Sequence, residues 1–177
     1  VGLEIIAKAA RTQKGQRSVK KVVGELGGKN AIIIDSDADL DEAVLGTMHS
    51  AFGFQGQKCS ACSRVIVVGG NYDKFLNRLI EAARSMTVGM PEKPGTLIGP
   101  VIDAGSQKRI LEMIEVGKKE GRMVFQGQAP QVGCFVPPTI FADIKPEHRL
   151  AQEEIFGPVL AVMKAENFDE ALKIANG

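Results

Sequence analysis

Tryptophan is absent from this sequence of 177 residues, tyrosine occurs once, and aromatic residues make up only 5% of the chain. Long apolar runs are missing too, since the longest, such as residues 31–34 and 65–68, have the length of a strand and not of a membrane span. No segment has the pattern of a signal or transit peptide. The sequence therefore predicts no membrane partner.

An excess of charge of one sign is also missing. The 22 lysines and arginines against 21 aspartates and glutamates give a net charge of +1, which argues against nucleic acid as a partner. The hydrophobic content of 44% and the charged content of 24% are ordinary for one folded domain. Three cysteines cannot all pair with one another, so we expect no disulfide framework and a reducing, cytoplasmic location.

Strand-like and helix-like segments alternate along the chain. Short apolar or β-branched runs predict strands at residues 20–23, 31–34, 64–68, 123–125, 135–141 and 158–163. Apolar residues at helical spacing predict helices at residues 1–10, 35–52, 72–86, 106–120 and 167–177. Pro137 and Pro138 confine their part of the fifth strand to an edge or a loop. The alternation predicts an α/β fold with an open, mostly parallel sheet flanked by helices.

Cys59 is the first candidate for chemistry, because it lies in a polar, glycine-containing loop between a helix and a strand. A thiolate is a strong nucleophile, although a small buried cysteine used for packing is an equally good interpretation. Cys59 and Cys62 also form a Cys-x-x-Cys pair, which leaves open a thiol redox module or half of a zinc site. Cys134, His49 and His148 would have to complete the zinc site, and no second close pair occurs.

Two carboxylate-bearing segments are the other candidates. Glu25 lies in a glycine-rich stretch where it can act as a general base through a water, or be an ordinary solvated residue. Glu153 and Glu154 precede Phe156 at the entry to a strand, where a carboxylate can bind ribose hydroxyls and a ring can pack on a flat heterocycle. Neither a complete phosphate loop nor a Gly-x-Gly-x-x-Gly pattern occurs.

Three segments in this order resemble the aldehyde dehydrogenase superfamily: Glu-Leu-Gly-Gly-Lys at residues 25–29, Gly-Gln-Lys-Cys at 56–59 and Glu-Ile-Phe-Gly-Pro at 154–158. The separation of Glu25 from Cys59 fits the family as well, and the resemblance covers essentially the whole chain. Within the family, residues 54–64 look most like the branch that oxidises glutamate γ-semialdehyde, formed from 1-pyrroline-5-carboxylate, to glutamate with NAD in proline catabolism.

The resemblance implies a mechanism of covalent catalysis. Cys59 would attack the aldehyde carbon, and its backbone N–H would form part of the oxyanion hole. Hydride would pass to NAD and leave a thioester, and Glu25 would activate the water that releases the acid. Ser60 resembles the residue that helps to bind the substrate carboxylate in this branch.

The resemblance also implies which residues contact the cofactor and what lies outside the chain. Glu154, Phe156 and Leu26 would contact NAD, Cys62 and Cys134 would be structural, and no metal is implied. Residues 1–177 would be the catalytic domain, cut from a longer chain whose NAD-binding domain is absent. Val1, with no helix cap before it, favours the same interpretation at the front of the chain.

We expect the full-length protein to be a homo-oligomer acting on a small aldehyde, and residues 1–177 alone to have no dehydrogenase activity. Three alternatives remain open at this stage. They are the same chemistry on another aldehyde, a thiol redox module that uses Cys59 and Cys62, and a noncatalytic interaction domain.

Overall fold

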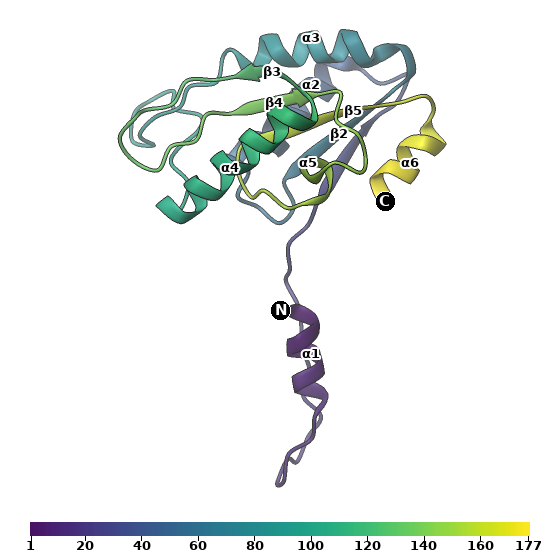
Figure 1. The fold of residues 1–177 in the computed structure, drawn as a ribbon, viewed down its shortest axis with the longest axis vertical. Helices are drawn as coiled ribbons and strands as arrows, with labels where there is room; N and C mark the ends of the chain where they lie inside the picture. The colour runs from purple at the N-terminus through teal and green to yellow at the C-terminus, as the bar shows by residue number, and fades with distance from the viewer.

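A five-stranded sheet forms the centre of the fold in this computed structural model, which describes residues 1–177 (Figure 1). The order across the sheet is β1-β2-β5-β4-β3, and the first four strands are parallel, with β3 antiparallel at one edge. The strands are β1 (Asn30–Ile34), β2 (Cys62–Val68), β3 (Arg122–Gln126), β4 (Thr139–Ala142) and β5 (Val159–Ala165). The predicted open, mostly parallel α/β sheet is confirmed.

Helices cover both faces of the sheet, which explains why the central strands are apolar runs. Val65 and Val67 of β2 join the core cluster that includes α2 and α3, whereas Ile66 and Val68 join the cluster of α4, α5 and α6. The helices are α1 (Gly2–Ala10), α2 (Leu40–Phe52), α3 (Tyr72–Ala83), α4 (Ala104–Glu120), α5 (Arg149–Gln152) and α6 (Phe168–Asn176), with two 3-10 turns, η1 (Gly53–Gly56) and η2 (Gly69–Asn71). None is long and apolar enough to span a bilayer.

The start of α2 differs from the predicted one. The helix was expected from the acidic residues 35–39, but it begins at Leu40, and residues 35–39 form a turn. Asp39 is the N-cap, and its carboxylate accepts hydrogen bonds from the N–H groups of Asp41 at 2.9 Å and Glu42 at 3.3 Å. Residues 35–39 therefore precede the helix and end in its N-cap. A short aspartate side chain bonds the free N–H groups of the first turn from the N-cap position, and not from within the helix.

Two strand predictions need correction. Residues 20–23 form no strand, because no other segment pairs with them, and Val22 and Val23 stay exposed. The segment at 135–141 becomes a strand only at Thr139, after Pro137 and Pro138, so the prolines lie in a loop as expected. The strand itself is not at the edge: β4 lies between β5 and β3.

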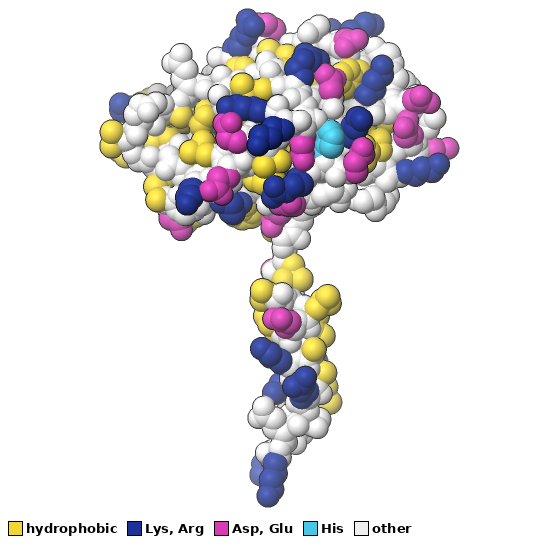
Figure 2. All heavy atoms as spheres, viewed as in Figure 1, with side chains coloured by type: hydrophobic (Ala, Val, Ile, Leu, Met, Phe, Trp, Pro, Cys, Tyr) yellow, Lys and Arg dark blue, Asp and Glu magenta, His cyan; other side chains and the backbone are white.

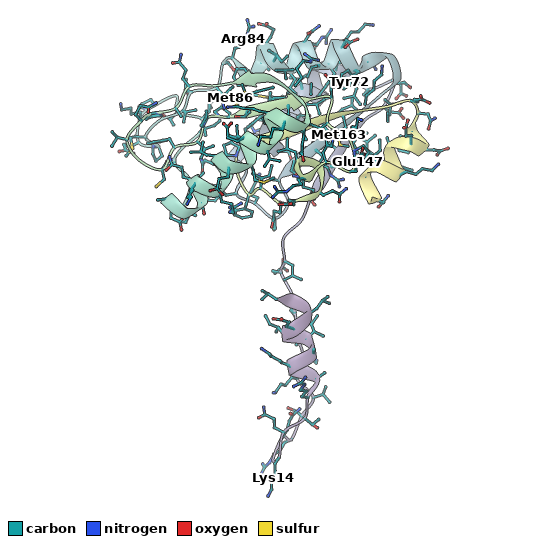
Figure 3. The ribbon with its side chains drawn as sticks, in the orientation of Figure 1. Lys14, Tyr72, Arg84, Met86, Glu147 and Met163 are labelled. Atoms are coloured by element: carbon teal, nitrogen blue, oxygen red, sulfur yellow. The ribbon has the colours of Figure 1, made fainter.

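The first residues extend away from the sheet (Figure 1). No residue of α1 is buried, and the apolar side chains of Val1, Leu3, Ile5 and Ile6 are exposed along it (Figure 2). Lys14 lies at the far tip of this extension, whereas Tyr72 and Met163 belong to the body (Figure 3). Packing against the body therefore contributes nothing to the stability of α1 in this structure.

Candidate active site

The three segments singled out in the sequence meet at one edge of the sheet. Residues 27–29 lead into β1, Cys59 and Ser60 lead into β2, and residues 154–158 lead into β5. Since β1, β2 and β5 are parallel neighbours, their amino ends lie side by side. The topology thus gathers three segments that are far apart in the sequence.

Direct contacts join these segments. The N–H of Gly28 donates to Glu154 Oε1 at 3.1 Å, which connects the first segment to the third. The side-chain amide of Asn30 donates to the carbonyl oxygen of Cys59 at 2.6 Å, which connects the first to the second. A Cβ at Gly27 would overlap the carboxylate of Glu154 in its present position, so glycine leaves room for this close approach.

Cys59 lies in a tight turn closed by a hydrogen bond from the N–H of Ala61 to the carbonyl of Lys58, at 3.0 Å. Its thiol is free and exposed, and Ser60 beside it is exposed as well. The backbone N–H groups of Cys59 and Ser60 donate to no other group of the chain. A nucleophile next to unpaired N–H donors is the arrangement that stabilises a developing oxyanion.

The backbone before Cys59 is strained. Phe54, Gln55 and Gly56 all have φ in the left-handed region, at 54°, 58° and 67°. Gly56 packs directly on the carbonyl of Gly157, where a Cβ would not fit, so this turn is held against the third segment. Phe156 in that segment also has a positive φ, of 55°. Backbone strain of this kind gathers at functional sites, because the surrounding structure has to impose it.

The residues predicted to act together are not all joined by contacts. The side chain of Glu25 is exposed and makes no hydrogen bond or ion pair. Leu26 is 58% exposed, and its methyl groups lie against Gly2 of α1. Both precede Gly28, which touches the Cys59 turn, so they lie where the extension joins the body. Their roles in catalysis and in cofactor binding stay predictions.

Lys29 is a feature that the sequence interpretation missed. Its ammonium nitrogen is buried and has no hydrogen-bond partner. Burial, followed by the repulsion of Arg64, lowers the pKa of Lys29 from 10.5 to about 8. The guanidinium of Arg64 donates to the Lys29 carbonyl at 2.6 Å and to Ala175 at 3.0 Å, and so connects β1 to the end of α6. An isolated lysine beside two glycines carries no sequence signal for such burial.

Cys62 lies in a different environment from Cys59. Its thiol is buried at the start of β2 and donates to the carbonyl of Arg64 at 3.3 Å. Burial raises its pKa to about 12, so it holds its proton at neutral pH. Cys62 is therefore not itself an attacking thiolate at neutral pH. No three His, Cys, Asp or Glu side chains gather as a metal ligand set would.

One small hollow borders these segments, and a larger one is lined by none of their residues. A space of about 10 Å³, roughly one water in size, lies between the Cys59 turn and residues 154–157, and is lined by Gly28, Cys62 and Glu154. A larger apolar groove of about 400 Å³ lies between α2 and α3, with Met48, Phe52 and Ile98 in its walls. Cys59 does not line this groove, and the chemistry is therefore assigned to the exposed turn and not to the groove.

Comparison with known proteins identifies relatives along the whole chain. A family model described as the aldehyde dehydrogenase family matches residues 1–177. A curated 1-pyrroline-5-carboxylate dehydrogenase of Geobacillus thermodenitrificans is 51% identical over 177 residues, which cover 99% of this chain and 34% of the relative. The chain thus spans about a third of the length of the curated relatives it matches.

Solved structures of similar proteins also match this chain along nearly its whole length. A 1-pyrroline-5-carboxylate dehydrogenase from Thermus with bound NAD superposes with a TM-score of 0.92 at 45% identity, over 99% of this chain and 34% of that one. Proline utilization A from Bdellovibrio bacteriovorus superposes with a TM-score of 0.96 at 53% identity, over 99% of this chain and 18% of that one.

Proposed function

Because this chain belongs to the aldehyde dehydrogenase family, we propose that it is the thiol-bearing catalytic part of an NAD-dependent enzyme that oxidises glutamate γ-semialdehyde to glutamate. The observation that carries the proposal is the exposed Cys59 turn, with two unpaired N–H groups, held against the segment of Glu154. Relatives about half identical in sequence and named 1-pyrroline-5-carboxylate dehydrogenase support the choice of substrate.

The first chemical step belongs to Cys59. Its thiolate attacks the aldehyde carbon, a C–S bond forms, and the carbonyl π electrons move to the oxygen. The N–H groups of Cys59 and Ser60, which have no partner in the chain, are assigned as donors to that oxyanion. Ser60 is assigned to the carboxylate of the substrate.

The segment of Glu154 suits a nicotinamide cofactor. One oxygen of its carboxylate accepts from Gly28, and the other has no partner in the chain, which leaves an acceptor for ribose hydroxyls. Phe156 follows with 37% of its surface exposed, and its ring is available to pack on a flat ring. When bound there, NAD would supply the hydride acceptor needed to convert the adduct on Cys59 into a thioester. Leu26 is assigned to the same cofactor.

The last step regenerates Cys59. Glu25 takes a proton from a water whose oxygen attacks the thioester carbon; the C–S bond breaks, the acid leaves, and the sulfur departs as thiolate. The free, exposed carboxylate of Glu25 is consistent with a group that works through a mobile water. A free thiol nucleophile suits a reducing compartment, and we assign the enzyme to the cytoplasm.

We propose that the remaining NAD site lies in another domain and that the complete enzyme is a homo-oligomer. Residues 1–177 alone should then produce no NADH from the semialdehyde, because hydride transfer needs an acceptor bound in position. Formation of NADH by residues 1–177 and by the complete enzyme, followed at equal concentration, tests this. Turnover by residues 1–177 would contradict the proposed division of the site.

A panel of aldehydes separates this substrate from others. With the complete enzyme, kcat/KM for glutamate γ-semialdehyde should exceed that for simple aliphatic aldehydes of similar length. Ser60→Ala should lower kcat/KM about tenfold for the semialdehyde and leave the aliphatic aldehydes nearly unchanged, because only the former has a carboxylate to bind. An enzyme that favours aliphatic aldehydes belongs to another branch of the family.

A further inference from the structure

We infer that Asn30 is a positioning residue for Cys59, an inference that rests on the proposed function of Cys59 as the nucleophile. Asn30 is the first residue of β1, and its side-chain nitrogen donates to the carbonyl of Cys59 at 2.6 Å and to that of Ala61 at 3.3 Å. One amide thus holds two carbonyls of the same turn. The only other hydrogen bond across the turn is the one from Ala61 to Lys58.

The bond to Cys59 determines where a catalytic donor points. The chain has no cis peptide bonds, so the C=O of Cys59 and the N–H of Ser60, which belong to one planar unit, point in opposite directions. With the carbonyl held toward β1 by Asn30, the N–H of Ser60 is directed away from β1. That N–H has no partner in the chain. Asn30 therefore preorganises a donor for the oxyanion formed at Cys59.

Glycine at position 28 leaves room for this contact. A Cβ there would lie 3.0 Å from the carbonyl oxygen of Cys59 and 3.2 Å from Oδ1 of Asn30. Gly28 also donates to Glu154. The same short stretch thus holds the nucleophile turn with a side chain and the proposed cofactor segment with a backbone N–H.

Asn71 provides a matched control. Its side-chain nitrogen also donates to two carbonyls of a turn, Ser36 at 2.8 Å and Asp35 at 3.4 Å, but that turn follows β1 at its carboxyl end. Asn30→Asp and Asn71→Asp make the same chemical change, removing both donors while keeping the shape of the side chain. Only the first of them alters the turn of Cys59.

The test uses the complete enzyme, with Asn30→Asp, Asn30→Ala and Asn71→Asp. Both Asn30 variants should lower kcat about tenfold or more and leave KM for NAD within about twofold, since the cofactor segment is unchanged. The Tm of the Asn30 variants should shift no more than the Tm of Asn71→Asp. The kcat of Asn71→Asp should stay within about twofold of that of the unchanged enzyme. Asn30→Ala, which adds no charge, shows that the missing donor and not the new carboxylate lowers kcat.

Three results would overturn the inference. They are an unchanged kcat in both Asn30 variants, an equal loss in Asn71→Asp, and a rise in KM for NAD that accounts for the whole loss. Cys59→Ala is assayed in parallel: full activity of that variant rejects the proposed function itself. Loss in Cys59→Ala together with normal Asn30 variants rejects only the positioning role.

Discussion

The two ends of the parallel strands in this fold are built differently. At the carboxyl ends of β1 and β5, polar side chains start the next helix: Asp39 caps α2, and Asn167 accepts from the N–H of Glu170 at 2.9 Å to cap α6. Asn71, after β2, bonds the carbonyls that follow β1. Polar groups at this edge are satisfied by one another.

At the amino ends of β1, β2 and β5, some polar groups are paired, as Asn30 and Gly28 are, but others have no partner in the chain. The N–H groups of Cys59 and Ser60 have no partner, the buried ammonium of Lys29 has none, and left-handed backbone precedes both Cys59 and β5. Ligands of open α/β sheets usually bind at the carboxyl ends of the strands. Here the proposed chemistry lies at the opposite edge, where the unpaired N–H groups are exposed and free to bind a ligand.

The largest effect on activity is expected from replacing the nucleophile at the amino ends of the strands. In the complete enzyme, Cys59→Ala should lower kcat by about a thousandfold or more, because the covalent step is lost. Cys134→Ala, which removes a second free thiol that packs against the apolar core, should keep kcat within about twofold. NADH formation measures both. Normal activity in Cys59→Ala would favour a noncatalytic interaction domain.

The next effect concerns the strained turn. Gly56→Ala should lower the free energy of unfolding by about 3 kcal/mol, because φ is +67° and the new Cβ would overlap the carbonyl of Gly157. Gly46→Ala, inside α2 with nothing within 4 Å, should raise it by about 0.5–1 kcal/mol. Urea unfolding of residues 1–177 checks both. Similar effects at the two glycines would mean that the turn is not strained.

A smaller effect comes from Lys29. Its pKa is lowered from 10.5 to about 8, so between these values the unfolded chain holds a proton that the folded chain has released, and stability rises with pH. Below pH 8 both states are protonated, and the cost of burying the charge is fully present. Cys62 acts in the opposite direction, because its pKa is raised from 9.0 to about 12. Its effect on stability grows mainly above pH 9.

In the interval from pH 8 to 9 the effect of Lys29 therefore outweighs that of Cys62. The free energy of unfolding should rise across it by at most about 1.4 kcal/mol, the limit for one proton. Lys29→Met should abolish the rise and be more stable than the parent chain at pH 7. Urea unfolding under reducing conditions measures each value. A rise that persists in Lys29→Met would assign it to another group.

The smallest effect is expected at the carboxyl ends of the strands, where polar groups pair with one another. Asp39→Ala removes the cap of α2 and should cost about 1 kcal/mol of stability. Since this edge holds no proposed catalytic group, kcat of the complete enzyme should stay within about twofold. Thermal unfolding and NADH formation check the two parts. A large loss of kcat would show that the two edges are coupled.

Local pattern was enough to predict much of the fold and to select the candidate residues. β-branched runs predicted β1, β2 and β5, and helical spacing predicted α3, α4 and α6, because these elements bury the faces that their own residues define. The loop position of Cys59 followed from the same alternation. The strand predicted at residues 20–23 from Val22 and Val23 was wrong, because residues of high strand propensity form a strand only when a neighbouring strand pairs with them.

The roles inferred for Asn30 and Lys29 could not be predicted in this way. Asn30 was simply the residue before an apolar run, and Lys29 the end of a glycine-rich stretch. Their partners are Cys59 and Arg64, about thirty residues or more away along the chain. Burial and hydrogen bonding depend on the strand order, which the local sequence does not specify.

By itself, the amino-acid sequence determined which segments become strands and helices, which family the chain resembles and which residues are candidates for chemistry. Side-chain spacing and residue type decide these properties locally. Only the tertiary structure decided that β1, β2 and β5 are neighbours, that Gly28, Cys59 and Glu154 meet, and that Asn30 holds the turn of the thiol. The physical reason is that contacts between distant segments depend on how strands pair, and pairing is a property of the whole folded chain.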